Sequence, residues 1–275
     1  MKIDDLLAGL MLGDGSLERQ KPTYNASLRI SRKETDEDYL LWSSKILSSI
    51  LSEKAITRKS IYDDRTNKTY RQIRLRTKSC AILSNLHNKW YKNGKKIIDA
   101  ELELNADIIK IWFADDGCVT VHKGKYGKCN FDIKFATHGF TKDEVIFLKN
   151  KLEDFFGFDF KMYGEIASSG KKQYTIRLFG VKKCKIFLRI IDPEFPLKRK
   201  SDLWRDKDCH VFEDIVYPRC KYCQSDLVYK FGKNQKGEVK FLCRGCGRQF
   251  TNRSSGLRKP NQSATGALIG EYWKE

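Results

Sequence analysis

The sequence predicts an α+β protein made of two pseudo-symmetric halves, each with the element order αββαββα, followed by a small module that carries four cysteines. Three observations predict this class. An apolar segment ending in Asp-Gly occurs twice, at residues 6–15 and 108–117. Each copy is followed by alternating strands and an amphipathic helix, and two matches in the same order indicate an internal duplication. Near the C-terminus, two Cys-x-x-Cys pairs flank a hairpin-like segment.

The duplication and the cysteine pairs divide the chain into four parts. The first half is expected at residues 1–98 and the second at residues 99–203. Residues 204–253 are expected to form a linker and the cysteine module, and residues 254–275 a polar tail. The tail is interpreted either as a flexible arm lying on a partner or as a disordered end.

Composition narrows the partner class. The chain has 275 residues, of which 40% are hydrophobic and 32% charged, so a globular fold is expected. Its formal charge of +18 is typical of proteins that bind a polyanion. No apolar run is long enough to span a bilayer, and the N-terminus does not resemble a signal peptide. We therefore expect an intracellular protein in the compartment that holds DNA, with its cysteines as thiols or metal ligands rather than disulfides.

The first apolar segment predicts a buried helix at residues 6–15. Gly9 and Gly13 weaken a helix, so a close approach of another backbone is expected there. Asp14 at the helix end is either a turn residue of an ordinary core helix or a functional carboxylate. The second copy favours the functional interpretation, because packing of the two helices would bring Asp14 and Asp116 together.

The remaining elements of the first half follow from periodicity. A hairpin is predicted at residues 16–32, a helix at 35–52, a second hairpin from strands at 55–63 and 69–78, and a helix at 80–91. The buried side of the helix at 35–52 is expected to consist of Leu40, Leu41, Ile46, Leu47, Ile50 and Leu51.

The second half repeats the pattern. Residues 130–135 alternate as a strand, and a helix is predicted at 141–156, beginning with a capping box between a Thr and a Glu three residues later. Strands are predicted at 158–166 and 172–179, and a helix at 181–191 ends before Asp-Pro.

One face of each predicted sheet is apolar and the other polar and basic. The polar side chains are of the types that read base edges in the major groove, so a concave DNA-binding saddle of two sheets is expected. The alternative is an ordinary solvated antiparallel sheet. The predicted DNA-contacting residues are Asn25, Ser27, Arg29, Tyr70, Gln72, Arg74, Arg76, Lys78, Asn130, Asp132, Lys134, Gln173, Thr175 and Arg177.

The two motifs resemble those of the LAGLIDADG homing endonucleases in their single-chain, two-motif form. LAGLMLGDG at residues 7–15 is close to the family pattern, whereas the second motif departs from it with Lys110, Ile111 and Asp115. The resemblance covers roughly residues 1–203. It implies a monomeric, magnesium-dependent enzyme that cuts both strands of a long, asymmetric double-stranded DNA target. Related folds also serve as transcription regulators or as maturases that bind intron RNA.

The resemblance also implies roles for individual residues. Asp14 and Asp116 would be catalytic ligands of Mg²⁺, an ion that prefers carboxylate and phosphate oxygens. Lys96, just before the second motif, would be the basic residue of the first half. In the second half the candidate is Lys198, with Lys200 as the alternative. Asp115 is expected to face solvent at the helix end.

Cys220, Cys223, Cys243 and Cys246 have the spacing of a four-cysteine zinc ribbon. So small a module has little core of its own, and the Zn²⁺ would be structural. A redox role would suit one Cys-x-x-Cys pair but not two around a hairpin. The ribbon is interpreted as an extra DNA-contacting module; a folding cap or protein-contact module is the alternative.

Overall fold

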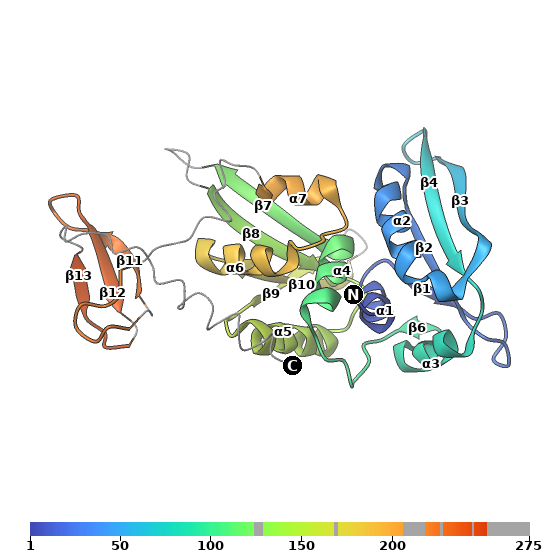
Figure 1. Ribbon diagram of the computed structural model, residues 1–275, viewed down its shortest axis with the longest axis horizontal. Coiled ribbons are helices and arrows are strands. Elements are labelled where there is room, and N and C mark those ends of the chain that lie inside the picture. The colour runs from blue at the N-terminus through green and yellow to red at the C-terminus, as the bar shows by residue number, and fades with distance from the viewer. Residues whose placement is uncertain (124–128, 168–169, 206–217, 226–227, 244, 252–275) are drawn as a thin grey trace. The chain divides into compact units, whose positions relative to one another are not determined.

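The protein was studied as a computed structural model. It describes residues 1–123, 129–167, 170–205, 218–225, 228–243 and 245–251, so the predicted tail at 254–275 lies outside the described residues. The chain divides into two compact units, residues 1–212 and 213–275. The first unit contains both predicted halves and the second contains the predicted ribbon (Figure 1).

The first half begins with the predicted apolar helix and continues into a four-stranded sheet with two further helices. Its elements are α1 (Ile3–Leu12), β1 (Ser16–Glu18), β2 (Ser27–Lys33), η1 (Glu34–Asp36), α2 (Glu37–Ile46), η2 (Ser48–Ile50), β3 (Leu51–Asp63), β4 (Lys68–Thr77), α3 (Ala81–Trp90), β5 (Tyr91–Lys92) and β6 (Lys95–Lys96). The short pair β5 and β6 forms a two-stranded ribbon of its own.

The second half repeats this order and adds one helix. Its elements are α4 (Ala106–Asp116), β7 (Gly117–Lys123), β8 (Cys129–Ala136), α5 (Lys142–Phe156), β9 (Lys161–Ile166), β10 (Lys172–Phe179), α6 (Val181–Ile191) and α7 (Lys198–Arg205). The capping box at the start of α5 is formed, and Gly157 ends that helix in a left-handed conformation.

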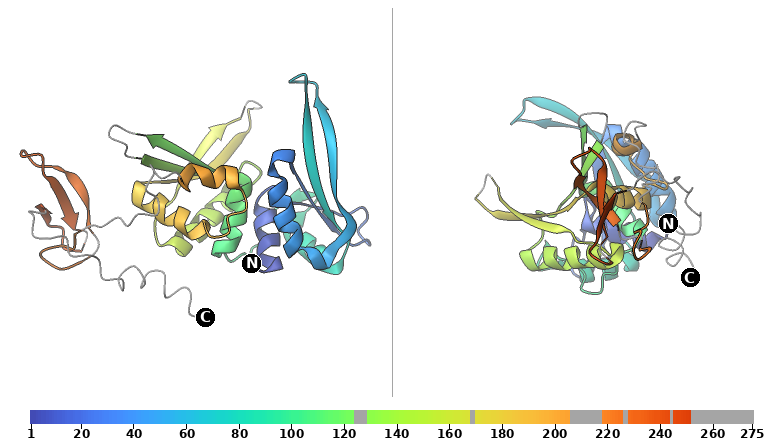
Figure 2. Two further views of the ribbon diagram at one scale, coloured as in Figure 1. Left: turned by 45° about the horizontal axis from the view of Figure 1, so that its top comes forward. Right: turned by 90° about the vertical axis from the view of Figure 1, so that its left-hand side faces the viewer.

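The two sheets confirm the duplication. Their strand orders are β1-β2-β4-β3 and β7-β8-β10-β9, and every neighbouring pair is antiparallel. Helices α1 and α4 lie side by side between the two sheets (Figures 1 and 2). The α+β class with two similar halves is therefore confirmed.

A single core joins the two halves. It includes the fully buried Leu10 and Met11 of α1 and Trp112 and Phe113 of α4. Ala26, just before β2, and Leu28 and Ile30 within it have no exposed surface, as their alternation predicted. In the second half, Phe113 packs against Phe135, Phe187, Phe195 and Trp204.

The main differences from the predicted elements concern α2 and α7. The helix expected at 35–52 is shorter, because Leu51 begins β3 and the amide of Lys78 donates to the carbonyl of Ile50. Leu41 is 42% exposed instead of buried. Helix α7 was not predicted, and Trp204 anchors it in the core of the first unit with its indole N–H bonded to Asp192.

The glycines of the first motif have the packing role expected for them. A Cβ on Gly9 would lie 2.5 Å from the Cβ of Ile111 and 3.0 Å from the carbonyl oxygen of Ile108 on α4. A Cβ on Gly13 would lie 2.3 Å from the Cβ of Asp115. Only glycine permits the two helices to approach this closely.

We expect Gly9→Val to destabilise the first unit by about 3 kcal/mol, the upper part of the range for overpacking a core. Urea unfolding monitored by tryptophan fluorescence measures the loss. Gly139→Val is the matched control, since a Cβ at Gly139 would have no neighbour within 4 Å. Equal unfolding midpoints for the two variants would contradict the close helix contact.

Candidate functional site

Asp14 lies just beyond the C-terminus of α1, where the chain turns into β1. Its backbone N–H donates to Oδ2 of Asp115 at 2.9 Å. Its carboxylate forms an ion pair with Arg32, with 3.1 Å between Oδ2 and Nη1. The Asp14 side chain is 46% exposed, so the carboxylate remains open to a ligand from solution.

Asp116 is the last residue of α4 and the counterpart of Asp14. Burial raises the pKa of Asp116 to about 7, and the negative charges of Asp14 and Asp115 add to this effect. The positive charges of Lys96 and Lys200 act in the opposite direction. In the described part of the chain its carboxylate makes no hydrogen bond or ion pair, and it lines a pocket together with Lys96 and His138.

Asp115 does not face solvent, and that prediction is wrong. Its side chain is fully buried between the two halves. One carboxylate oxygen accepts the hydroxyl of Tyr39 at 2.9 Å and pairs with Arg32; the other accepts the Asp14 amide. Burial raises the pKa of Asp115 to about 6 against the lowering effect of Arg32. The prediction failed because its partners come from a strand and a helix of the other half.

The basic residues occupy equivalent places in the two halves. Lys96 Nζ donates to the carbonyls of Gly13 at 2.9 Å and Gly15 at 2.7 Å, on either side of Asp14. Lys200 Nζ donates to the carbonyls of Ala114 at 2.6 Å and Gly117 at 2.7 Å, which flank Asp115 and Asp116. Burial lowers the pKa of Lys96, although Asp116 acts in the opposite direction.

By this symmetry Lys200, the alternative candidate, occupies in the second half the place that Lys96 occupies in the first. Lys198 begins α7, and its side chain lies outside the described residues. The sequence could not separate the two lysines, because the helical turn that directs Lys200 toward α4 was itself not predicted.

The acidic pair fits a hard divalent cation. Asp14 and Asp116 supply carboxylate oxygens, which Mg²⁺ prefers. Burial is the main cause that raises the pKa of Asp116, and the charge of Asp14 adds to it, so the ionised carboxylate is disfavoured there without a cation. A bound metal ion would relieve this repulsion. Asp14 and Asp116 are thus the residues that could hold the metal.

Most of the predicted DNA-contacting residues keep exposed surface. On the first sheet, Tyr70, Gln72, Arg74 and Arg76 lie along β4, with Arg29 on β2. Asn25 and Lys78 are exposed but lie just outside β2 and β4, respectively. On the second sheet the residues with exposed surface are Asn130, Asp132, Lys134, Gln173 and Arg177.

Two of these residues are buried instead. Ser27 is 2% exposed and Thr175 has no exposed surface, so the prediction that they face a ligand is wrong. Alternation along a strand assigns a side chain to a face, but a short side chain can be covered by longer neighbours on that face. We withdraw both residues from the candidate DNA-contacting set.

Acidic side chains hold several of the cations on these faces. Glu18 pairs with Arg29 and, at 3.4 Å, with Arg76 on the first sheet. Glu165 pairs with Arg177 at 2.6 Å and Lys134 at 3.7 Å on the second. These pairs fix the long basic side chains in place and would have to be exchanged for phosphate contacts on binding.

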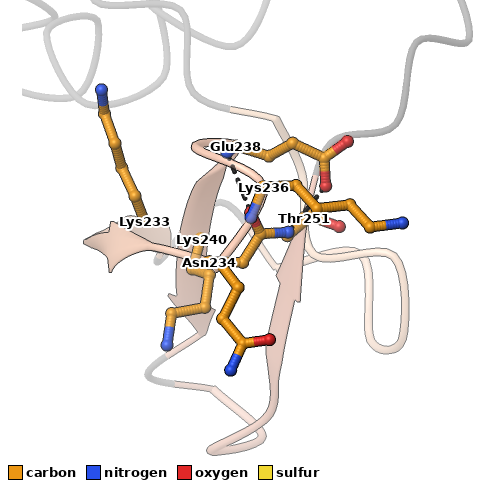
Figure 3. Close-up of a pocket in the computed structure, with 7 residues that line it drawn as sticks. Lys233, Asn234, Lys236, Glu238, Lys240 and Thr251 are labelled. Carbon is orange, nitrogen blue, oxygen red and sulfur yellow. Dashed lines mark hydrogen bonds between the residues drawn. The ribbon is translucent and has the colours of Figure 1, made fainter.

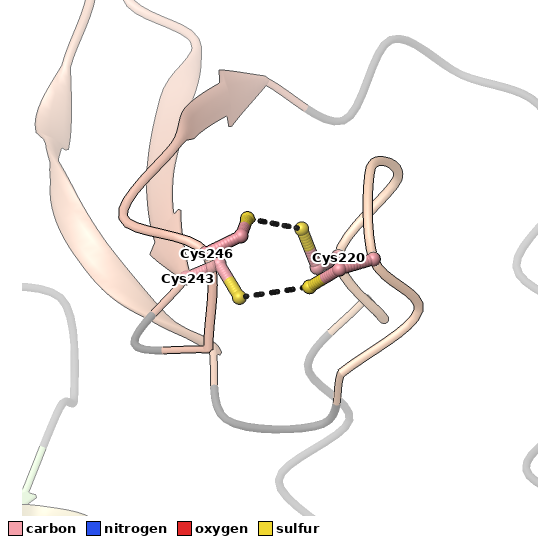
Figure 4. A group of neighbouring side chains, drawn as sticks. Cys220, Cys243 and Cys246 are labelled. Carbon is pink, nitrogen blue, oxygen red and sulfur yellow. Dashed lines mark hydrogen bonds between the residues drawn. The ribbon is translucent and has the colours of Figure 1, made fainter.

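The cysteine module forms the predicted hairpin and a third strand. Its strands β11 (Val228–Lys233), β12 (Val239–Cys243) and β13 (Gln249–Thr251) make one antiparallel sheet. The sulfur atoms of Cys220, Cys223, Cys243 and Cys246 all lie within 4.8 Å of one another (Figure 4). Four converging thiols of this spacing fit a tetrahedral Zn²⁺ site.

Two similar halves define a protein of the LAGLIDADG fold: they are joined through α1 and α4, which approach closely at Gly9 and Gly13, and an aspartate stands at or just beyond the end of each helix. The chain belongs to the LAGLIDADG DNA endonuclease family, whose model matches residues 5–186. The homing endonuclease I-WcaI bound to its DNA recognition sequence has a similar fold, with a TM-score of 0.61 and 20% identity over 72% of this chain and 83% of that chain.

Two curated relatives match part of the chain. An uncharacterised protein of Methanocaldococcus jannaschii is 35% identical over 123 residues, 44% of each chain. The cytochrome b mRNA maturase bI2 of Debaryomyces hansenii is 26% identical over 144 residues, 51% of this chain and 52% of that protein. The matches therefore span about half the length of these relatives. None of the described helices is long and apolar enough to cross a membrane.

Sequence reasoning missed three members of the site, namely Arg32, Tyr39 and the buried Asp115. Arg32 lies on β2 next to residues predicted to face outward, yet it is only 8% exposed. A charged residue inside an otherwise apolar strand face was the available signal, because Arg32 shares its parity with Leu28 and Ile30.

Proposed function

We propose that the protein is a site-specific homing endonuclease that makes a double-strand break in a long asymmetric DNA target by Mg²⁺-dependent hydrolysis. The observation that carries this proposal is the presence, in both halves, of an acidic helix end flanked by a lysine that bonds to the neighbouring carbonyls. The protein would act as a monomer inside the cell, because one chain supplies both halves of the site.

The residues present account for the separate requirements of phosphodiester hydrolysis. Asp14 and Asp116 would hold Mg²⁺, which supplies charge stabilisation at the scissile phosphates and activates water. Lys96 and Lys200 are fixed beside the acidic pair, where they would order water or stabilise the developing negative charge. The outward basic residues of the two sheets would fix the duplex by phosphate and base contacts.

The ribbon would extend this contact as a separate DNA-binding module. Lys233, Lys236 and Lys240 line a shallow pocket around the β11–β12 turn (Figure 3). The Asn234 side chain shapes that turn by accepting the amides of Lys236 at 3.0 Å and Glu238 at 2.9 Å. Lysines gathered on an ordered turn suit the DNA backbone, which contributes affinity without sequence preference.

Removal of zinc should unfold the ribbon but leave the first unit intact. Metal binding supplies most of the folding free energy of such modules, so Cys220→Ser should lose the bound Zn²⁺ and the order of β11 and β12. Metal analysis and amide hydrogen exchange measure these two losses. Cys118→Ser, an exposed thiol outside the ribbon, should retain both. A DNA footprint of unchanged length for Cys220→Ser would support the folding-cap alternative instead.

The similarity to a maturase favours a second candidate function. A maturase acts on intron RNA, and an additional splicing role could coexist with cleavage on the same basic surfaces. Binding of RNA transcribed from the DNA that flanks the reading frame, tested beside duplex DNA of the same sequence, separates the two roles.

Cleavage of a randomised duplex library in the presence of Mg²⁺ tests the main proposal. Enrichment of one long cut sequence is the expected result, and the sequence ends give the position of each strand break. Binding without cuts under Mg²⁺ and Mn²⁺ would overturn the nuclease and leave a non-cleaving binder of DNA or RNA.

A further inference from the structure

The two halves differ at the residue just before the aspartate that each contributes to the proposed metal site. Gly13 precedes Asp14, whereas Asp115 precedes Asp116, and the two residues meet across the helix interface. The Asp115 side chain has no exposed surface, so it cannot contact DNA or a metal ion directly. All of its described polar contacts go to the first half, to Asp14, Arg32 and Tyr39.

Arg32 connects this buried carboxylate to Asp14. Its Nη2 pairs with Asp115, while its Nη1 pairs with Asp14 at 3.1 Å. The guanidinium also lies over the ring of Tyr39, 4.7 Å from the centroid. Its side chain is only 6% exposed, so water cannot screen its charge effectively.

Among the described residues of the second half, the position equivalent to Arg32 carries no cation. Ser16 and Cys118 each lie two residues after the aspartate of their half, Asp14 and Asp116. Ser16 pairs with Arg29 in the first sheet, and Cys118 pairs with Lys134 in the second. By this register the counterpart of Arg32 is Thr137, a neutral residue whose hydroxyl donates to the carbonyl of Tyr174. A guanidinium therefore contacts one acidic residue of the pair and not the other.

A buried arginine beside a metal ligand would normally oppose cation binding. Arg32 pairs with Asp14 and Asp115, and the charge of Asp36 acts on it more weakly. Without Asp115, Asp14 would be the main counter-charge of Arg32, and a divalent cation would have to displace the guanidinium. Asp115 changes this balance, because its charge neutralises Arg32 and its hydrogen bonds hold the guanidinium in place.

We propose that Asp115 is a positioning residue that neutralises and anchors Arg32, so that Asp14 keeps both its orientation and its charge for a divalent cation. The inference rests on the proposed function, since it assumes that Asp14 binds the metal. It assigns a third carboxylate to the site, one that acts through Arg32 and the Asp14 amide without touching the metal or the DNA.

The test measures Mn²⁺ binding to the Asp115→Asn variant. Binding is detected as a loss of the electron paramagnetic resonance signal of free Mn²⁺. Asparagine preserves the shape of the side chain and removes its charge. We expect Mn²⁺ affinity to fall about tenfold, the scale found for residues that orient metal ligands. The Mg²⁺ concentration for half-maximal cleavage should rise by a similar factor, while the rate at saturating Mg²⁺ changes much less.

A second variant separates charge balance from loss of structure. Asp115→Asn combined with Arg32→Met removes both buried charges, and Mn²⁺ affinity should recover most of what the single variant lost. The control is Arg71→Lys on β4, where a lysine keeps the positive charge of the surface pair with Glu34; this variant should bind Mn²⁺ as the wild type does. Thermal unfolding confirms that each variant is folded.

The outcomes distinguish this inference from the proposed function. Wild-type affinity in Asp115→Asn, or no recovery in the double variant, would overturn the role of Asp115 and leave the nuclease proposal standing. If Asp14→Asn binds Mn²⁺ as tightly as the wild type does, the metal site itself is overturned, and both proposals fail with it.

Discussion

Asp14→Asn and Asp116→Asn should each reduce DNA cleavage at least about 10³-fold, because each would remove a ligand of the proposed metal site, and metal ions supply several kcal/mol of transition-state stabilisation. The asparagines keep the side-chain shape, so binding of the duplex should persist. Asp116→Asn also removes a charge that burial disfavours, since the pKa of Asp116 is raised to about 7. This variant is therefore expected to be at least as stable as the wild type in the absence of metal.

The measurement uses a duplex labelled on both strands, with cleavage rates and binding affinity determined in parallel. Asp154→Asn, an exposed position on α5, is the control and should cleave at the wild-type rate. If Asp14 and Asp116 hold one metal ion together, loss of either carboxylate should slow the breaks in both strands. Wild-type rates in either variant would remove the acidic pair from the mechanism.

Lys96→Met and Lys200→Met should each lower the cleavage rate by about 10²-fold, the usual loss when one fixed donor to a developing charge is removed. Methionine retains the apolar stem of the side chain but not the ammonium group that bonds to the carbonyls around the acidic pair. Single-turnover rates at saturating protein separate this loss from weaker DNA binding.

Lys198→Met decides between the two candidates in the second half. With Lys200 as the active residue, Lys198→Met should leave the single-turnover rate at saturating protein within about threefold of the wild type, because loss of a phosphate contact weakens binding and not the chemical step. A large loss in Lys198→Met together with a small one in Lys200→Met would reverse our assignment. Thermal unfolding of all three variants checks that the β5–β6 and α7 segments remain folded.

Much of the fold could be predicted because its signals are local. Alternation assigned Leu28 and Ile30 to the core, and the repeated apolar segment ending in Asp-Gly revealed both halves. The cysteine pairs predicted a hairpin module whose sulfur atoms do converge. The boundaries of α2 and the presence of α7 could not be predicted, since contacts of the neighbouring strand and of Trp204 set them.

What the sequence by itself determined is the duplicated architecture, the acidic residue at or just beyond each helix end and the spacing of the four cysteines. Each depends on the order of residues along one segment, which periodicity and motif spacing describe directly. Only the tertiary structure decided that Asp115 is buried, that Lys200 matches Lys96, and that Ser27 and Thr175 are covered. The physical reason is that burial and charge balance depend on side chains brought from distant segments: the anchors of Asp115 are Arg32 and Tyr39, which belong to the other half.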